Sequence, residues 1–167
     1  PTRPDSWQEI LDLAKFFNGK DWNGDGKEDF GITMHLKVGE QGFFNYIALA
    51  GGFVVMPAPG DDPTKVTRYY NQFWFDPETM KPLINTPGHV RAMEMLVELT
   101  KYGPAAMVGW GLGEAWDVFL RGNAAMCFTF GDIGTLSQDT RVSVIQGKLG
   151  VVPIPGSEEV YNLETNE

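Results

Sequence analysis

The sequence contains little of the chemistry on which redox, zinc and nucleic-acid functions depend. Its 167 residues include one cysteine, Cys127, and two histidines, His35 and His89. One cysteine excludes an internal disulfide, and two isolated histidines support neither a zinc site nor a Ser-His-Asp triad. The chain carries 13 Lys plus Arg and 22 Asp plus Glu, a formal net charge of −9. Because a phosphate backbone needs a basic surface, nucleic acid is not an expected partner.

Long hydrophobic runs are also absent. No apolar stretch approaches the roughly 20 residues of a membrane-spanning helix, and the first residues, PTRPDSW, lack both the charged and the apolar regions of a signal peptide. We therefore expect no membrane-spanning segment. The chain does contain 43% hydrophobic and 13% aromatic residues, which is enough for a globular core of its own.

Two capping signals predict helices with defined starts. Ser6 stands at capping-box spacing from Glu9, which predicts a helix over 6–17. Thr86 followed by Pro87 predicts the start of another helix. The apolar face of this second helix is expected to consist of Val90, Met93, Leu96, Val97 and Leu99.

The remaining apolar segments predict alternating strands and helices. We expect Asp132 to cap a further helix, Cys127 to be a buried and unreactive thiol, and His89 to lie at the surface. The predicted helices lie in GFFNYIALAGG, which its glycines close, and in GEAWDVFLRGN. The predicted strands are one in FGITMHL and two buried ones in AAMCFTF and KLGVVPIPG. The segment FVVMPAPGDDPTKVTRYYNQFWF is expected to form loops and short irregular strands. This alternation favours a layered α/β domain.

The segment DWNGDGKEDFGI gathers acidic side chains at alternate positions. Its opening matches the D-x-N-x-D-G pattern of a calcium loop, in which oxygen ligands surround a hard cation. The twelfth position is Ile32 instead of glutamate, so a complete EF-hand is excluded. The shorter calcium loop would use the side chains of Asp21, Asn23, Asp25 and Asp29 and the carbonyl of Lys27. A structural calcium ion and a solvated turn built by Asx hydrogen bonds are both consistent with this pattern.

Aromatic residues beside glycines are the main candidates for binding. Trp110 stands between glycines in VGWGLGE, and Phe43, Phe44, Asn45 and Tyr46 open the predicted helix in GFFNYIALAGG. Such rings either present flat faces to a sugar or belong to an ordinary core. A pair of acids in GEAWDVFLRGN, Glu114 and Asp117, matches either a glycosidase carboxylate pair or a solvated helix face.

The order of these segments resembles the family of extracytoplasmic solute-binding proteins of sugar ABC importers, the group that contains maltose-binding protein. The resemblance covers nearly the whole chain in colinear blocks. These are PDSWQEILDLAKFF, DGKEDFGI, IALAGGF, INTPGHVRAMEML, EAWDVFLRGNAAM with its F-x-x-G-x-A-A-M signature, and LGVVPIPG.

The resemblance implies an α/β fold that is one lobe of a two-lobed type II periplasmic-binding-protein fold. It would comprise most of the C-terminal lobe plus a hinge crossing. The implied divisions are a ligand-binding lobe over 1–125, a hinge crossing and the start of the other lobe over 126–148, and a truncated return to the first lobe over 149–167. The chain would therefore be a fragment whose N-terminal lobe is missing.

The resemblance also implies a function without bond chemistry. The protein would bind a sugar or polyol between two lobes outside the cytoplasmic membrane and deliver it to a membrane permease. The implied ligand residues are Phe43, Phe44, Asn45, Trp110, Glu114, Phe130, Gly131 and Asp132. Two alternatives remain open, namely a glycoside hydrolase fragment that uses Glu114 and Asp132, and a calcium-dependent carbohydrate-binding module.

Overall fold

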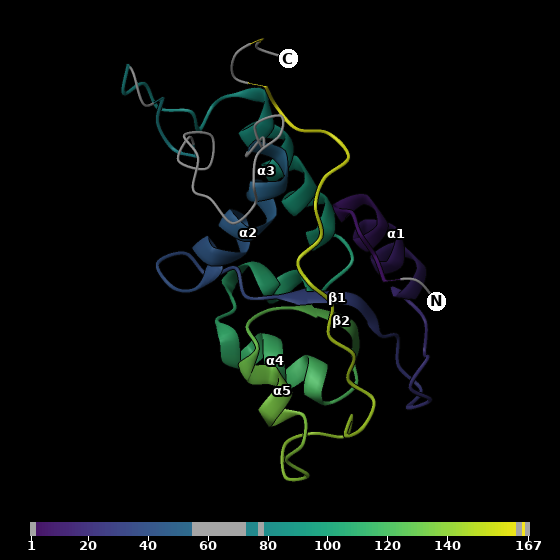
Figure 1. Cartoon of the computed structure of the whole chain (residues 1–167). Helices are drawn as coiled ribbons and strands as arrows, with labels where there is room; N and C mark the ends of the chain where they lie inside the picture. The colour runs from purple at the N-terminus through teal and green to yellow at the C-terminus, as the bar shows by residue number, and fades with distance from the viewer. Residues whose placement is uncertain (1–2, 55–72, 77–78, 163–164, 166–167) are drawn as a thin grey trace.

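The computed structural model describes residues 3–54, 73–76, 79–162 and 165. Figure 1 shows the order of the elements along the chain. They are α1 (Trp7–Phe17), β1 (Phe30–Met34), α2 (Gly42–Val54), α3 (Pro87–Thr100), the 3₁₀ helix η2 (Ala105–Gly109), α4 (Leu112–Leu120), β2 (Ala124–Phe128) and α5 (Asp132–Leu136). Most of the segment expected to form loops and irregular strands, residues 55–72, lies outside the described residues. None of the helices in the described ranges is long and apolar enough to span a membrane.

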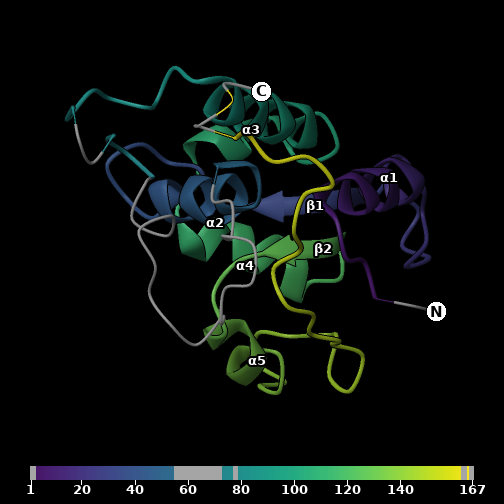
Figure 2. The same ribbon diagram turned by 45° about the horizontal axis from the view of Figure 1, so that its top comes forward.

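A two-stranded parallel sheet forms the middle layer of the molecule. β1 pairs with β2 in a register that places Ile32 opposite Met126. Helices α1, α2 and α3 lie on one side of the strands, and α4 and α5 lie on the other (Figures 1 and 2). Parallel strands need helical crossovers that cover both faces of the sheet. The predicted α/β architecture is therefore present in the described chain.

Helix α1 forms as its sequence predicts. The Ser6 side chain accepts a hydrogen bond from the Glu9 backbone N–H, and the Glu9 side chain accepts one from the Ser6 N–H, which completes the capping box. The helix packs directly on β1, because a Cβ atom added to Gly31 would lie 2.0 Å from the Ala14 carbonyl oxygen. Only glycine allows this approach of helix and strand.

Helix α3 begins at Pro87 as predicted, but only Leu96 and Leu99 of its predicted apolar face are buried. Val90, Met93 and Val97 are about half exposed, because α3 turns a different side toward α2. The buried residues of α3 are Gly88, His89, Ala92, Met95, Leu96 and Leu99. The expected cap also differs, since the Thr86 hydroxyl donates to the Leu83 carbonyl instead of accepting from the helix.

Glycines did not end α2, which continues through Gly51 and Gly52 to Val54. A Cβ atom on Gly52 would lie 3.1 Å from the Ser157 nitrogen, so this glycine admits the C-terminal segment close to the helix. At α5 the predicted cap was also shifted by one residue. Gly131 is the N-cap, and Asp132 is the first helical residue.

The predicted strand in KLGVVPIPG was wrong. Val151 and Ile154 are 81% and 57% exposed, and in the described chain the segment pairs only at its end, where Gly156 bonds to the backbone of Asp5 and Trp7. Pro153 removes a backbone donor, and a strand needs a hydrogen-bonded neighbour. The predicted burial of AAMCFTF on both faces was also wrong, since β2 is only half-buried beyond Ala124.

Candidate functional site

The loops that follow β1 and β2 meet at the carboxyl ends of the two strands. Asn45, on the first turn of α2, is buried and joins them. Its Nδ2 donates to the carbonyl of His35 at 3.3 Å and to the carbonyl of Phe128 at 3.4 Å. Ligands of open parallel sheets bind beyond this edge. The predicted ligand residue Asn45 therefore positions the loops at the edge where a ligand site is expected.

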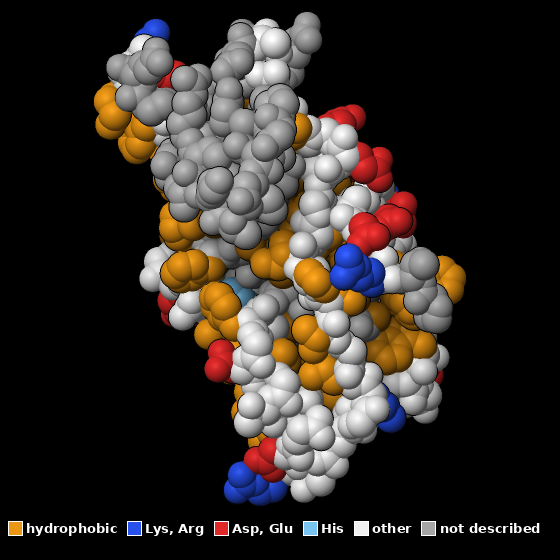
Figure 3. All heavy atoms as spheres, in the orientation of Figure 1, with side chains coloured by type: hydrophobic (Ala, Val, Ile, Leu, Met, Phe, Trp, Pro, Cys, Tyr) orange, Lys and Arg blue, Asp and Glu red, His pale blue; other side chains and the backbone are white. Residues whose placement is uncertain are grey.

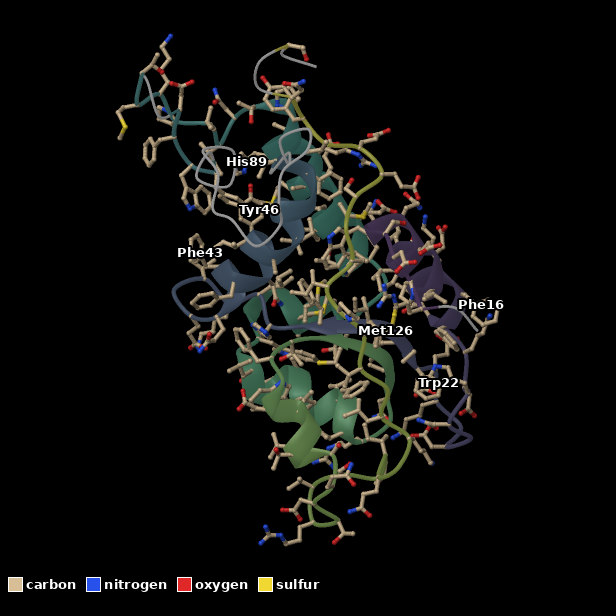
Figure 4. All side chains as sticks on the ribbon, viewed as in Figure 1. Phe16, Trp22, Phe43, Tyr46, His89 and Met126 are labelled. Atoms are coloured by element: carbon tan, nitrogen blue, oxygen red, sulfur yellow. The ribbon has the colours of Figure 1, made fainter. Side chains whose placement is uncertain are left out.

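Three aromatic rings gather at the same edge. The ring of Phe130, from the loop after β2, stacks on His35 with centroids 5.3 Å apart, and it meets Phe44 edge-on at 5.9 Å. Phe43 and Phe44 are 54% and 50% exposed. Figure 3 shows hydrophobic side chains exposed on this face of the molecule, and Figure 4 places Phe43 at the outer end of α2. The site thus offers flat apolar faces beside a buried amide.

The loop after β1 adds a charged group, Lys37, to this edge, where it meets the loop between η2 and α4. The backbone N–H of Lys37 donates to the Trp110 carbonyl at 3.0 Å, and Lys37 Nζ pairs with Glu40 at 2.5 Å. The hydrogen bond with Glu40 raises the pKa of Lys37, and the charge of Glu114 contributes to the same shift. Trp110 itself is half-buried and packs against the main core. Trp110 and Glu114 are therefore connected to the loop after β1 through Lys37.

Not every predicted ligand residue joins these contacts. Gly131 and Asp132 are exposed at the start of α5, and no contact in the described chain connects Asp132 to Asn45 or Trp110. Asp117 forms an exposed ion pair with Arg121 at 2.8 Å, an arrangement typical of a solvated helix face.

His35 and Trp74 are two residues at this end of the molecule that sequence reasoning missed. Trp74 stacks on Phe43 at 5.6 Å and on His89 at 5.5 Å. His35 is fully buried beneath Phe130. The only signal for His35 in the sequence is its position near the end of the predicted strand FGITMHL, because the segments at strand ends carry functional groups.

The prediction that His89 lies at the surface was wrong. This residue is 1% exposed, and both ring nitrogens are bonded. Nε2 donates to the carbonyl of Phe73 at 2.7 Å, so Nδ1 accepts from the hydroxyl of Tyr46 at 2.7 Å. Figure 4 shows Tyr46 and His89 side by side between α2 and α3. A residue in the first turn of a helix is exposed only where no other element packs on it, and here α2 and Phe73 cover His89.

An apolar groove with a volume of about 260 Å³ runs between β2 and residues 149–155. Met126, which Figure 4 labels near the centre of the molecule, and Trp7 line the groove, and Phe130 and Gly131 border it as well. Cys127 also faces this space, and burial raises the pKa of its thiol to about 12. The thiol is therefore protonated at neutral pH, which agrees with the predicted unreactive cysteine, but the residue is half-buried instead of fully buried as predicted.

The acidic loop lies at the opposite end of β1 from the candidate ligand site, as the positions of Trp22 and Phe43 in Figure 4 show. Its carboxylates accept hydrogen bonds from the loop's own backbone. Asp21 accepts from Gly24 and Gly26 at 2.7 and 2.9 Å, and the buried Asp29 accepts from the Trp22 N–H at 3.1 Å. The described residues contain no group of three or more acidic, histidine or cysteine side chains that could hold a metal ion. The calcium site stays a prediction.

No family model matches this chain, and no curated protein matches it. Solved structures do. The chain is similar to an ABC transporter solute-binding protein from Agrobacterium vitis S4 with bound D-mannitol, with 19% identity and a TM-score of 0.69 over 94% of this chain and 33% of that one. It is similar to an ABC transporter solute-binding protein from Agrobacterium radiobacter K84 in complex with ribitol, with 17% identity and a TM-score of 0.69 over 94% and 34%. It is also similar to maltose-bound MalE3 from T. maritima, with 22% identity and a TM-score of 0.69 over 93% and 34%.

This chain has the fold of one lobe of an ABC transporter solute-binding protein. It spans about a third of the length of the solved structures it matches. The fold class predicted from the sequence is thereby confirmed. The divisions at residues 125 and 148 and the ligand-binding roles of individual residues stay predictions.

Proposed function

We propose that this chain forms one wall of the solute cleft in the binding component of an ABC importer. The solute is a sugar or a polyol, the second wall comes from another lobe of the same protein, and the filled protein delivers its solute to a membrane permease. Binding and delivery of the solute take place outside the cytoplasmic membrane. The observation that supports the proposal best is the meeting of the two loops at the carboxyl edge of the parallel strands, where Asn45 bonds to the Phe128 carbonyl and the ring of Phe44 contacts that of Phe130.

The chemistry of this edge suits a solute with apolar faces and polar rims. Exposed rings such as Phe43 and Phe44 stack on the C–H face of a sugar. Amide, carboxylate and ammonium groups nearby pair with its hydroxyls. The similar structures hold D-mannitol, ribitol or maltose and are binding proteins, which supports binding over hydrolysis.

Isothermal titration calorimetry tests this proposal. The protein, produced from its complete reading frame, is titrated with D-mannitol, ribitol and maltose. We expect one-to-one binding of at least one of these solutes, with the solute recovered unchanged by chromatography. Release of a cleaved sugar would favour the glycoside hydrolase alternative, and complete loss of binding in EDTA would favour the calcium-dependent module.

Two aromatic variants locate the site. Phe44→Ala should weaken binding at least about fivefold, since an aromatic ring that a bound ligand covers contributes roughly 1 kcal/mol or more to the binding free energy. Phe16→Ala is the matched control, because Phe16 is 60% exposed on α1, away from the candidate site (Figure 4). Equal affinities for the two variants would contradict the proposed position of the cleft.

A further inference from the structure

His35 is a buried histidine whose two ring nitrogens form no hydrogen bond with the residues that the structure describes. Its side chain is fully buried. Buried polar groups in native proteins are nearly always paired, because an unpaired one has lost its water without compensation. A buried polar side chain that costs stability in this way is typical of a functional site.

The position of His35 agrees with such a role. It directly follows β1 at the carboxyl edge of the sheet, and its carbonyl is held by Asn45. Its ring is covered by the ring of Phe130, which is 36% exposed and contacts the half-exposed Phe44. One aromatic ring from the loop after β2 therefore covers the imidazole at the edge of the sheet that carries the candidate site.

We propose that His35 binds hydroxyl groups of the solute after the Phe130 ring moves aside. One ring nitrogen donates its N–H to a hydroxyl oxygen, and the other accepts the proton of a neighbouring hydroxyl. A neutral imidazole offers one donor and one acceptor, and adjacent hydroxyls of a polyol supply the matching acceptor and donor. This inference rests on the proposed function and assigns a specific recognition residue within it.

Burial supports the neutral form. Desolvation lowers the pKa of His35, with a smaller opposing effect from the backbone of Gln41 and of His35 itself. A neutral imidazole carries no charge to pair with a carboxylate, and its acceptor nitrogen matches a hydroxyl and not a carboxylate oxygen. We therefore expect this residue to favour a neutral polyol over a sugar acid.

The second buried histidine provides a matched control. His89 has both nitrogens bonded within the protein, so its role is structural. We compare His35→Phe with His89→Phe by thermal unfolding, and titrate the stably folded variants with D-mannitol and ribitol. His35→Phe should keep or raise the Tm and weaken solute binding roughly tenfold or more. His89→Phe should lower the Tm. His35→Asn, which keeps a donor and an acceptor, should restore part of the affinity.

The outcomes separate this inference from the proposed function. Unchanged affinity of His35→Phe for a solute that the wild type binds would overturn the role of His35 and leave the proposed function standing. A loss of Tm as large as that of His89→Phe would make His35 a structural residue and would also overturn it. If the wild type binds none of D-mannitol, ribitol and maltose, both the proposed function and this inference are refuted.

The covering role of Phe130 has its own test. Phe130→Ala should increase the rate at which diethyl pyrocarbonate modifies His35, measured by peptide mass spectrometry, while His89 serves as the internal reference. Addition of the bound polyol should slow the modification again. An unchanged rate at His35 would show that Phe130 does not control access to the ring.

Discussion

Replacing His89 with phenylalanine removes two hydrogen bonds and keeps an aromatic ring of similar shape. In the wild type, Nε2 donates to the Phe73 carbonyl, and Nδ1 accepts from the Tyr46 hydroxyl, both at 2.7 Å. The new phenyl ring still packs against Trp74, on which the imidazole is stacked. The change therefore isolates the polar contribution from the packing.

The expected loss of stability follows from the two partners left behind. A buried group without its hydrogen bond costs about 1–3 kcal/mol. The Tyr46 side chain is 8% exposed and the bond to Phe73 is partly buried, so the combined cost is about 2–4 kcal/mol. For a domain of this size that corresponds to a fall in Tm of roughly 5–15 °C.

Tyr46→Phe completes a double-mutant cycle measured by thermal and urea unfolding. This variant removes the hydroxyl and leaves Nδ1 of His89 without its donor. In the wild type, burial raises the pKa of Tyr46, so its hydroxyl still donates to His89 at mildly alkaline pH. The double variant should be less destabilised than the sum of the two single variants by about 0.5–1.5 kcal/mol. Additive effects, or a Tm of His89→Phe equal to that of the wild type, would refute the assigned bonds.

Three further predictions concern packing, pH and calcium. Gly31→Ala should destabilise the protein by about 3 kcal/mol or more, because the new methyl group would overlap the Ala14 carbonyl. Gly51→Ala, whose methyl group would enter open space, should be neutral or stabilising by up to about 1 kcal/mol. Equal Tm values for the two variants would contradict this packing. Burial lowers the folded-state pKa of His35, so the unfolded chain binds more protons than the folded one near and below pH 6.5. The wild type should therefore lose stability relative to His35→Phe on acidification from about pH 7.5 to 5.5, by at most about 1.4 kcal/mol per pH unit. Parallel profiles of Tm against pH for the two proteins would exclude this contribution. If the acidic loop binds calcium, the ion should raise the Tm of the wild type and not that of Asp25→Ala, whereas an equal response of both proteins would remove the metal assignment.

Local elements were largely predictable from the sequence. The capping box at Ser6 and Pro87 at the start of α3 are signals carried by a few neighbouring residues, and both helices begin there. The alternation of strands and helices predicted the α/β layers for the same reason. A parallel pair such as β1 and β2 cannot form without a crossover that covers the sheet.

The buried face of α3 could not be predicted in this way. The helix carries apolar residues on more than one side, so periodicity alone permitted a face through Val90, Met93 and Val97. Packing against α2 instead buried the side that contains His89 and Ala92. The strand expected in KLGVVPIPG failed for a related reason, since a strand exists only where another strand accepts its hydrogen bonds.

By itself, the sequence determined where most of the helices begin and which class of fold the elements build, because capping, periodicity and the needs of parallel strands act over short distances along the chain. Only the tertiary structure decided which polar groups find partners. It gave the ring of His89 two hydrogen bonds and placed the ring of His35 under Phe130 without a hydrogen bond to any described residue. His35 and Phe130 meet only because the sheet brings the ends of β1 and β2 together, and His89 meets Tyr46 only because α3 packs on α2. The burial that results sets the cost of each unpaired group.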